Sequence, residues 1–296
     1  MRISIIIPTL GRREDLERCL AALDGQAGDF EVLVMDQNGP EFGLEAVCAP
    51  HRNVTHVLSP VLGLSVNRNL AFARSTGEWI LYADDDCVLA PEYLARAARG
   101  LEAGAGRGTS SRQIFFTEVR NLEDGAYYTF PLTDDDQTLG YGNFKKIPSI
   151  GFIFSRAAVE ALRGFDECLG LGARYGSGED TDILLRALGM GIPVRRLPGC
   201  VILHPRQKKS AASLDRCRKY ALGYGALFAK HILIQPWRRK PRIIASWMWI
   251  LASNVGGIVL NLFDGARREY YWNSLVFKGI GYVRYLLRET PGAAAG

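Results

Sequence analysis

Residues 79–86 read WILYADDD, an apolar run that ends in the three aspartates Asp84, Asp85 and Asp86. Such a run is expected to form a buried strand whose carboxyl end places the acids at a sheet edge, where open α/β folds build ligand crevices. Adjacent carboxylates repel one another unless a cation lies among them, and a divalent ion that carries phosphate oxygens meets this need. The segment therefore predicts a metal–nucleotide site in which Asp86 is a metal ligand and Asp84 contacts the ribose or the water shell of the metal.

A second run of three aspartates, at residues 134–136, serves as an internal comparison. It follows Pro131-Leu132-Thr133 and has no apolar strand before it. We therefore predict a solvated loop at residues 134–136 and place the metal–nucleotide site at residues 84–86.

Strand-like and helix-like segments alternate through the first 205 residues. We expect strands at residues 3–7, 30–35, 53–58, 79–83, 150–154 and 194–203. Helices are expected at residues 65–74, 91–101, 156–162 and 181–188, and another follows the first strand, with Leu16, Leu20 and Leu23 on one face. This alternation predicts an α/β fold with a largely parallel sheet covered by helices.

Charge divides the chain of 296 residues into two parts. Residues 1–205 carry 20 Lys and Arg against 27 Asp and Glu, whereas residues 206–296 carry 16 against 4. This asymmetry predicts an α/β domain over residues 1–205 and a separate basic, helical region over residues 206–296. The six cysteines are scattered without a Cys-x-x-Cys pair, which is typical of reduced thiols in a cytosolic protein.

Further candidates for chemistry lie at the ends of other predicted elements. The segment Gly178–Asp182, GEDTD, opens a helix after a glycine-rich approach, residues 170–178. Acids in a first turn complement the helix dipole, which alone can account for Asp182. The glycines, however, let the backbone approach a ligand, and a carboxylate there can act as a general base.

Asp36, Arg68 and His204 are further candidates, and Arg68 and His204 each admit two interpretations. Asp36 ends the second predicted strand, and Arg68 can hold phosphate or base oxygens in a bidentate grip or form a surface ion pair. His204 ends the last predicted strand, where it is either a metal ligand or a capped histidine.

Taken together, these residues resemble glycosyltransferase family 2, whose members have the GT-A fold and use nucleotide sugars. The matching motifs run in family order across residues 3–205. They are Ile5-Ile6-Ile7-Pro8-Thr9 with Arg12, Val34-Met35-Asp36, Gly63-Leu64-Ser65 with Arg68-Asn69, Gly77-Glu78-Trp79-Ile80 leading into Asp84–Asp86, Gly164-Phe165-Asp166, and Gly178–Asp182 with Arg186. Two departures are Asn67, where the family often has alanine, and Gln37-Asn38, where it often has Asp-Gly.

The resemblance implies a GT-A catalytic domain over residues 1–205, with a Rossmann-like, mixed and mostly parallel sheet, and an inverting single-displacement transfer. It implies that the nucleotide contacts Pro8, Thr9, Arg12, Asp36, Arg68, Asp84 and Asp85. A divalent ion, Mn²⁺ or Mg²⁺, would be held by Asp86, Asp84 and His204. Asp180 would act as the base and Glu179 would orient the acceptor or the base, so Asp86 and Asp180 are expected to face one cleft. The family most often uses uridine diphosphate sugars.

Residues 243–263 are 21 uncharged residues between the basic clusters 238–242 and Arg267-Arg268. About 20 apolar residues can span a bilayer, but polar residues such as Asn254 and Asn261 interrupt the stretch. A shallow helix, a re-entrant hairpin, a helix packed on the catalytic domain and a dimer interface remain alternatives. We favour attachment to an anionic membrane surface, peripheral or monotopic, at the cytoplasmic face of the inner membrane. Attachment to this membrane predicts that the acceptor is a polyprenyl-linked saccharide in envelope or exopolysaccharide synthesis.

Three other functions fit the sequence less well. Sugar-nucleotide pyrophosphorylases, which are nucleotidyltransferases, have a Gly-x-Gly-Thr-Arg loop after the first strand. At the corresponding position of this chain, residues 8–12 read Pro-Thr-Leu-Gly-Arg. A non-catalytic membrane-associated partner would not need Asp84, Asp86 and Asp180. Nucleic-acid binding could use the basic region, but its basic residues lie beside long apolar runs, which suit lipid better.

Overall fold

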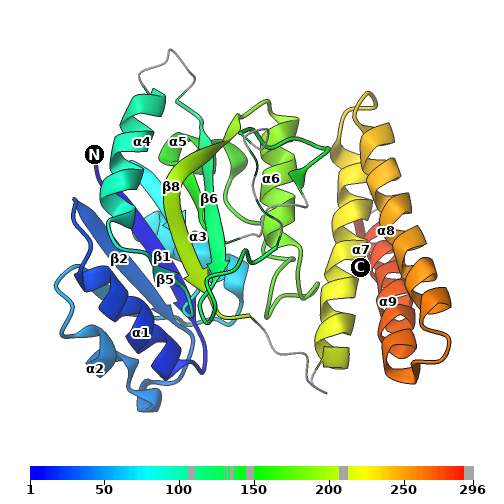
Figure 1. The fold of residues 1–296 in the computed structure, drawn as a ribbon, viewed down its shortest axis with the longest axis horizontal. Helices are drawn as coiled ribbons and strands as arrows, with labels where there is room; N and C mark the ends of the chain where they lie inside the picture. The colour runs from blue at the N-terminus through cyan, green and yellow to red at the C-terminus, as the bar shows by residue number, and fades with distance from the viewer. Residues whose placement is uncertain are drawn as a thin grey trace, which may run out of the picture. The chain divides into compact units, whose positions relative to one another are not determined.

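A computed structural model describes residues 1–105, 111–129, 131, 133, 137–144, 150–206 and 213–289, and Figure 1 shows its fold. The chain forms two compact units, one made of Met1–Phe165 with Arg186–Gln207 and the other of Asp166–Leu185 with Lys208–Gly296. The predicted loop at residues 134–136 lies outside the described residues. The functional division at residue 205 stays a prediction.

The first unit contains a mixed sheet with the strand order β3-β2-β1-β4-β7-β6-β8-β5. Its strands are β1 (Ile3–Thr9), β2 (Phe30–Asp36), β3 (Val54–Leu58), β4 (Trp79–Tyr82), β5 (Val88–Leu89), β6 (Ile114–Asn121), β7 (Phe152–Ser155) and β8 (Val194–His204). The pairs β1–β2, β2–β3, β1–β4 and β6–β8 are parallel, and β7 and β5 pair antiparallel with their neighbours. The expected mixed, mostly parallel sheet is confirmed.

Helices follow the strands as the alternation predicts. They are α1 (Arg13–Asp24), α2 (Leu44–Cys48), α3 (Leu64–Arg74), α4 (Tyr93–Ala105), α5 (Arg156–Leu162) and α6 (Glu179–Gly189), with the 3-10 helix η1 (Pro40–Phe42). Leu16, Leu20 and Leu23 are buried on α1, as their spacing predicts. They pack against Ile3, Ile5, Ile7 and other strand residues of one sheet face, which α2 and α4 also cover. Burial of this apolar face is the main force that holds the layers together.

Strand β6 is the longest strand that the sequence analysis did not identify, and β5 and α2 were not predicted either. Strand β6 lies between β7 and β8, and only its first three residues, Ile114–Phe116, form an apolar run before polar residues begin. The glycine-rich stretch before it and the turn after it obscure this short signal. Because β7 pairs antiparallel with both β4 and β6, it turns a parallel sheet into a mixed one.

The topology brings the ends of several strands to one region of the sheet. Thr9 at the end of β1 pairs in register with Asp36 at the end of β2. Strand β4 runs parallel to β1, so the residues that follow Tyr82 emerge beside Thr9. On the other half of the sheet, Asn121 of β6 is in register with His204 at the end of β8.

The second unit is helical. Helices α7 (Ser213–Ile234), α8 (Lys240–Leu260) and α9 (Gly265–Glu289) lie side by side (Figure 1), and the unit also includes the first turns of α6. Trp247 of α8 stacks between Phe228 of α7 and Tyr282 of α9, with ring centroids 4.9 and 5.8 Å apart. Among the described residues, α8 is long and apolar enough to cross a membrane by length and composition alone, and 22% of its most apolar window is buried.

Candidate functional site

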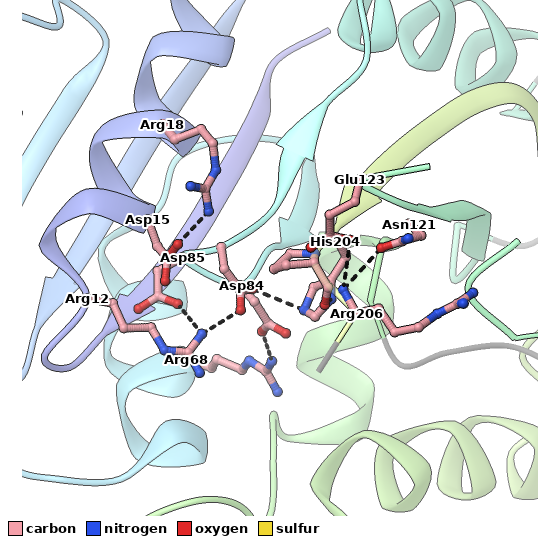
Figure 2. Close-up of polar contacts among 12 residues, drawn as sticks. Arg12, Asp15, Arg18, Arg68, Asp84, Asp85, Asn121, Glu123, His204 and Arg206 are labelled. Atoms are coloured by element: carbon pink, nitrogen blue, oxygen red, sulfur yellow. Dashed lines mark hydrogen bonds and ion pairs between the residues drawn. The ribbon is translucent and has the colours of Figure 1, made fainter. Parts of the chain in front are cut away.

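The three acids that follow β4 are surrounded by cations from other elements. Arg12, in the loop between β1 and α1, places Nη1 3.0 Å from Asp85 Oδ1 and 2.6 Å from Asp86 Oδ2. Arg68 of α3 places Nη2 3.2 Å from Asp84 Oδ1. Figure 2 shows the two guanidinium groups approaching the acid cluster from different elements. The repulsion expected among the carboxylates is therefore relieved by side chains of the chain itself.

The two arginines differ in their exposure to solvent. The Arg68 side chain is buried and lies over the Phe165 ring, with its guanidinium carbon 5.0 Å from the ring centroid. The interpretation of Arg68 as a surface ion pair is therefore wrong, because the pair with Asp84 forms on a buried guanidinium. The Arg12 side chain is 41% exposed, so this loop residue can change partners at little structural cost.

Burial dominates the electrostatics of Asp85. It raises the pKa of Asp85 to about 6, although Arg12 and a hydrogen bond from Thr9 favour the charged form. Thr9 Oγ1 donates that bond to Asp85 Oδ2 over 2.8 Å. Burial acts on Asp86 in the same direction, but His204 and Arg12 outweigh it, so the pKa of Asp86 lies below its ordinary value.

His204 and Asp86 lie close enough to form an ion pair or to share a cation. His204 Nδ1 lies 2.8 Å from the carbonyl oxygen of Pro205, which can only accept, so Nδ1 carries a proton. In the neutral ring, Nε2 then presents a lone pair to Asp86 Oδ1, which lies 3.0 Å away. Asp86 Oδ1 is buried and accepts no well-directed hydrogen bond. Two lone pairs that face each other need a cation, which is either a second proton on the ring or a metal ion.

The donor set also bears on which ion would fit. Possible ligand atoms of Asp86, Cys87 and His204 all lie within 4.8 Å of one another. Burial raises the pKa of the Cys87 thiol well above its ordinary value, so the thiolate that a metal needs is disfavoured. Carboxylate and imidazole remain, a set that suits a hard or intermediate divalent ion better than a soft one. His204 is therefore placed as a ligand would be, and capping by Pro205 sets its tautomer.

Asp36 forms a separate network at the end of β2. It is buried, and its Oδ1 accepts hydrogen bonds from the backbone N–H and the side-chain amide of Asn38, over 2.9 and 2.8 Å. His56 of β3 places Nε2 2.9 Å from Asp36 Oδ2. Gln37 accepts a bond from the backbone N–H of Gly63 over 2.8 Å. Gln37 and Asn38, the departures from the family pattern, thus hold the loops around Asp36.

His56, Asn38 and Gln37 are site residues that the sequence analysis missed. The available signal for His56 is its position two residues before the end of β3, a strand that runs parallel to β2. Neither pairing nor register could be read from the sequence, because β3 is short and alternates weakly between apolar and polar residues.

The acids of α6 lie in the second unit. Glu179 is buried, whereas Asp180 is partly exposed. Asp182 is fully buried, with Oδ1 2.7 Å from Lys230 Nζ and 2.9 Å from His231 Nε2. Interaction with the helix dipole alone therefore does not account for Asp182, because its carboxylate also contacts two residues of α7.

Two of the glycines before α6 lie against α7. Gly178 has a φ of +95°, and a Cβ at this position would lie 3.4 Å from the carbonyl oxygen of Gly223 and 3.5 Å from Leu227 Cβ. A Cβ on Gly176 would lie 3.1 Å from Lys219 Cβ. The left-handed backbone therefore favours glycine at position 178, and close packing against α7 favours it at position 176, whereas the approach of a ligand to these glycines stays a prediction.

Among the residues predicted for the site, the first unit gathers Thr9, Arg12, Arg68, His204 and the three acids into one cluster. Pro8 precedes Thr9 within β1, and Asp36 belongs to the adjacent network of Asn38 and His56. Asp180 and Glu179 belong to the other compact unit, and their placement opposite Asp86 stays a prediction.

Sequence comparisons identify relatives of the chain. A sequence model described as Glycosyl transferase family 2 matches residues 4–162. A dolichol-phosphate mannosyltransferase of Pyrococcus furiosus is 25% identical over 128 residues, which cover 41% of this chain and 36% of the relative. An uncharacterized protein of Mycobacterium tuberculosis, Rv1525, is 26% identical over 194 residues, or 64% of this chain and 68% of that one. The chain thus spans about a third of the length of the mannosyltransferase.

Solved structures share the fold over nearly the whole chain. The mannosyltransferase PcManGT from Pyrobaculum calidifontis, in complex with GDP-Man and Mn²⁺, has a TM-score of 0.62 at 17% identity, covering 97% of this chain and 87% of that one. TarS residues 1–349 from S. aureus, in complex with UDP-GlcNAc, has a TM-score of 0.57 at 16% identity, covering 96% and 92%. Because the sequence identities are only 16–17%, the likeness to these two structures shows a shared fold and no more.

Proposed function

The chain belongs to glycosyl transferase family 2 and is a glycosyltransferase with the GT-A fold, and on this premise we propose that it transfers a sugar from a nucleotide diphosphate sugar to a hydroxyl of a lipid-linked saccharide. The proposed reaction is metal-dependent and inverts the anomeric carbon. The observation that carries it is the cluster of Asp84, Asp85 and Asp86 with Arg12, Arg68 and His204 at the strand ends.

The neighbours support a nucleotide-sugar donor and a divalent ion, since one is bound to UDP-GlcNAc and another to GDP-Man with Mn²⁺. We expect a uridine diphosphate sugar first, with guanosine as the alternative base. The family match favours this reading over the nucleotidyltransferase and the non-catalytic partner considered above.

In the proposed site, Asp86, His204 and Asp84 would hold a divalent ion, Mn²⁺ or Mg²⁺. When bound, the ion supplies positive charge that stabilises the leaving diphosphate. Arg12 and Arg68 supply guanidinium groups, which suit phosphate oxygens through bidentate hydrogen bonds. Thr9 and Asp85 fix the Arg12 loop, and Asp36 with its network lies where a base contact is expected.

Asp180 is the proposed base. The acceptor oxygen attacks the anomeric carbon, the bond to the diphosphate breaks and the electron pair leaves with the diphosphate. The acceptor proton passes to the Asp180 carboxylate, and Glu179 orients the acceptor or the base. This single displacement needs no covalent glycosyl-enzyme, unlike that of retaining glycosidases.

Purified protein incubated with a panel of nucleotide sugars tests this function. We expect one donor to be consumed with release of free nucleoside diphosphate, faster in the presence of a saccharide acceptor and lost when a chelator removes divalent ions. Release of nucleoside monophosphate or pyrophosphate instead would contradict the proposed transfer, because it requires cleavage of a different bond.

We also propose that the second unit attaches to an anionic membrane surface. One side of α8 is buried through Ile243 and Trp247, whereas Met248, Trp249 and Leu260 are exposed. Exposed basic residues flank this apolar face, with Arg238 and Arg242 before it and Arg267 and Arg268 after it. An apolar face between basic clusters suits the headgroup region of an anionic bilayer, which supports a polyprenyl-linked acceptor at the cytoplasmic face of the inner membrane in polysaccharide synthesis.

Flotation with phospholipid vesicles checks this attachment. The protein is expected to float with vesicles that contain an anionic lipid, and less so with neutral vesicles or at high salt. Replacing both Met248 and Trp249 with serine should weaken binding by about tenfold or more, because each apolar side chain contributes about 1.5–3 kcal/mol when buried. Met190→Ser, which changes an exposed methionine of the first unit, is the matched control. Equal recovery of all variants in the soluble fraction would contradict the proposal.

A further inference from the structure

Buried charges connect α6 to α7 within the second unit. Lys230 Nζ lies 2.7 Å from Asp182 Oδ1 and 2.6 Å from Asp166 Oδ2, so one ammonium serves two carboxylates. His231 Nε2 lies 2.9 Å from the same oxygen of Asp182. Asp182 and His231 have no exposed surface, and Lys230 is 9% exposed. Buried charges carry a large desolvation cost and are rarely retained for stability alone, so this network calls for another explanation.

The orientation of the His231 ring is set from its other side. The Gln235 amide lies 3.1 Å from the carbonyl oxygen of Leu185 and 3.3 Å from His231 Nδ1. A carbonyl oxygen only accepts, so the amide nitrogen faces both atoms and donates to Nδ1. Nε2 then carries the proton that His231 donates to Asp182. The hydrogen bonds of this network thus run from donors on α7 to the Asp182 carboxylate in the first turn of α6.

The same face of α7 also contacts residues just before that turn. Ser177 Oγ donates to the carbonyl oxygen of Tyr220 over 2.9 Å, and Gly178 packs against Gly223 and Leu227. Burial raises the pKa of Tyr224, a hydrogen bond with the Thr181 side chain opposes this shift, and the charges of Asp180 and Glu179 add to it. Positions 220, 223, 224, 227, 230 and 231 recur every three to four residues, which is the spacing of one helix face.

We propose that Lys230 and His231 are positioning residues, which act through Asp182 to set the orientation of Asp180 and Glu179 at the start of α6. The inference rests on the proposed function, in which Asp180 is the base. Asp180 is partly exposed, whereas Glu179 and Asp182 on either side of it are buried, so the segment that carries Asp180 is anchored while Asp180 itself reaches solvent. In-line attack depends on this placement, since an error of about 1 Å at a reacting group can cost about 10²-fold in rate.

Paired substitutions at each residue test the proposal. His231→Leu removes the Nε2 donor, whereas His231→Gln keeps an N–H donor of similar reach. Lys230→Met removes the ammonium and keeps most of the side-chain volume. We expect His231→Leu and Lys230→Met to lower kcat by about 10–10²-fold, with His231→Gln within a few-fold of the native protein. The affinity for the nucleoside diphosphate with Mn²⁺, measured by calorimetry, should not change in any of them.

The controls separate positioning from stability and from the base assignment. Lys219→Met removes an exposed ammonium from α7 and keeps the Cβ that packs near Gly176, so its kcat should be unchanged. If His231→Leu and His231→Gln lower the melting temperature alike and leave kcat alike, the network is only structural and the inference fails. If Asp180→Asn retains turnover, the proposed base fails. If Asp180→Asn is inactive while Lys230→Met and His231→Leu turn over normally, the inference alone fails. If Lys230→Met does not fold, Lys230→Arg replaces it. This variant keeps the charge but changes the reach of the side chain, and we expect the same loss of kcat.

Discussion

Asp180→Asn is expected to lower kcat for sugar transfer by about 10³-fold, because general-base catalysis contributes about 10²–10⁴-fold and an amide cannot accept the acceptor proton. The substitution keeps the size of the side chain at a partly exposed position, so folding should be preserved. Nucleotide binding should persist, since the residues proposed to hold the nucleotide lie elsewhere in the chain. Single-turnover kinetics with donor and acceptor, together with calorimetry of nucleoside diphosphate and Mn²⁺, measure the two properties separately.

Asp215→Asn is the matched control for Asp180→Asn, because Asp215 is an exposed acid in the first turn of α7. It should turn over like the native protein. Retained transfer by Asp180→Asn would remove Asp180 from the role of base and direct attention to Glu179, whereas loss of nucleotide binding by the same variant would indicate a misfolded protein.

The second large effect is expected at Asp86. Asp86→Ala removes the carboxylate that faces His204 Nε2, and a bound divalent ion stabilises transition-state charge by several kcal/mol. We therefore expect the increase in nucleotide affinity that Mn²⁺ provides in the native protein to disappear, with a loss of about 10²-fold or more in transfer. Calorimetric titration of nucleoside diphosphate with and without Mn²⁺ measures this directly. An unchanged difference between the two titrations would exclude Asp86 as a ligand.

Arg12→Met gives the contrast that makes the Asp86 result specific. Arg12 contacts Asp86 through the oxygen that does not face His204, so it competes with any ion for that carboxylate. Its loss should strengthen Mn²⁺ binding in the absence of nucleotide and weaken nucleotide binding in the presence of the ion. Arg13→Met, which changes the adjacent exposed arginine paired with Glu17, should alter neither.

The sequence predicts the fold well, and it also predicts that several polar residues gather near Asp84–Asp86, because both depend on local patterns. An apolar run that ends in Asp84–Asp86 carries its own context, and parallel strands bring their carboxyl ends to one region, so Thr9, Arg12 and Asp36 could be placed near the acids. The helix Arg156–Leu162 has the bounds that its pattern predicts.

Contacts between residues that are distant in the sequence could not be predicted. His56 meets Asp36 only because β3 pairs with β2, and β6 lies in the sheet because β7 and β8 flank it on both sides. Lys230 and His231 lie about 50 residues after Asp182 on a helix whose pattern reads as apolar packing. Tertiary contacts of this kind leave no mark on local periodicity, so the packing of Gly176 and Gly178 against α7 could not be predicted.

The guanidinium of Arg12 has a consequence for the life of the protein in the cell. Many proteins with an ion-binding site cannot fold until their ion arrives, because unscreened charges in the empty site oppose compaction. In this chain, the guanidinium groups of Arg12 and Arg68 already lie among the acids, so the native form can be reached before the proposed ion binds. In the proposed metal-dependent reaction, supply of the ion would then govern when the molecule starts work, and a shortage would leave a reserve of folded protein.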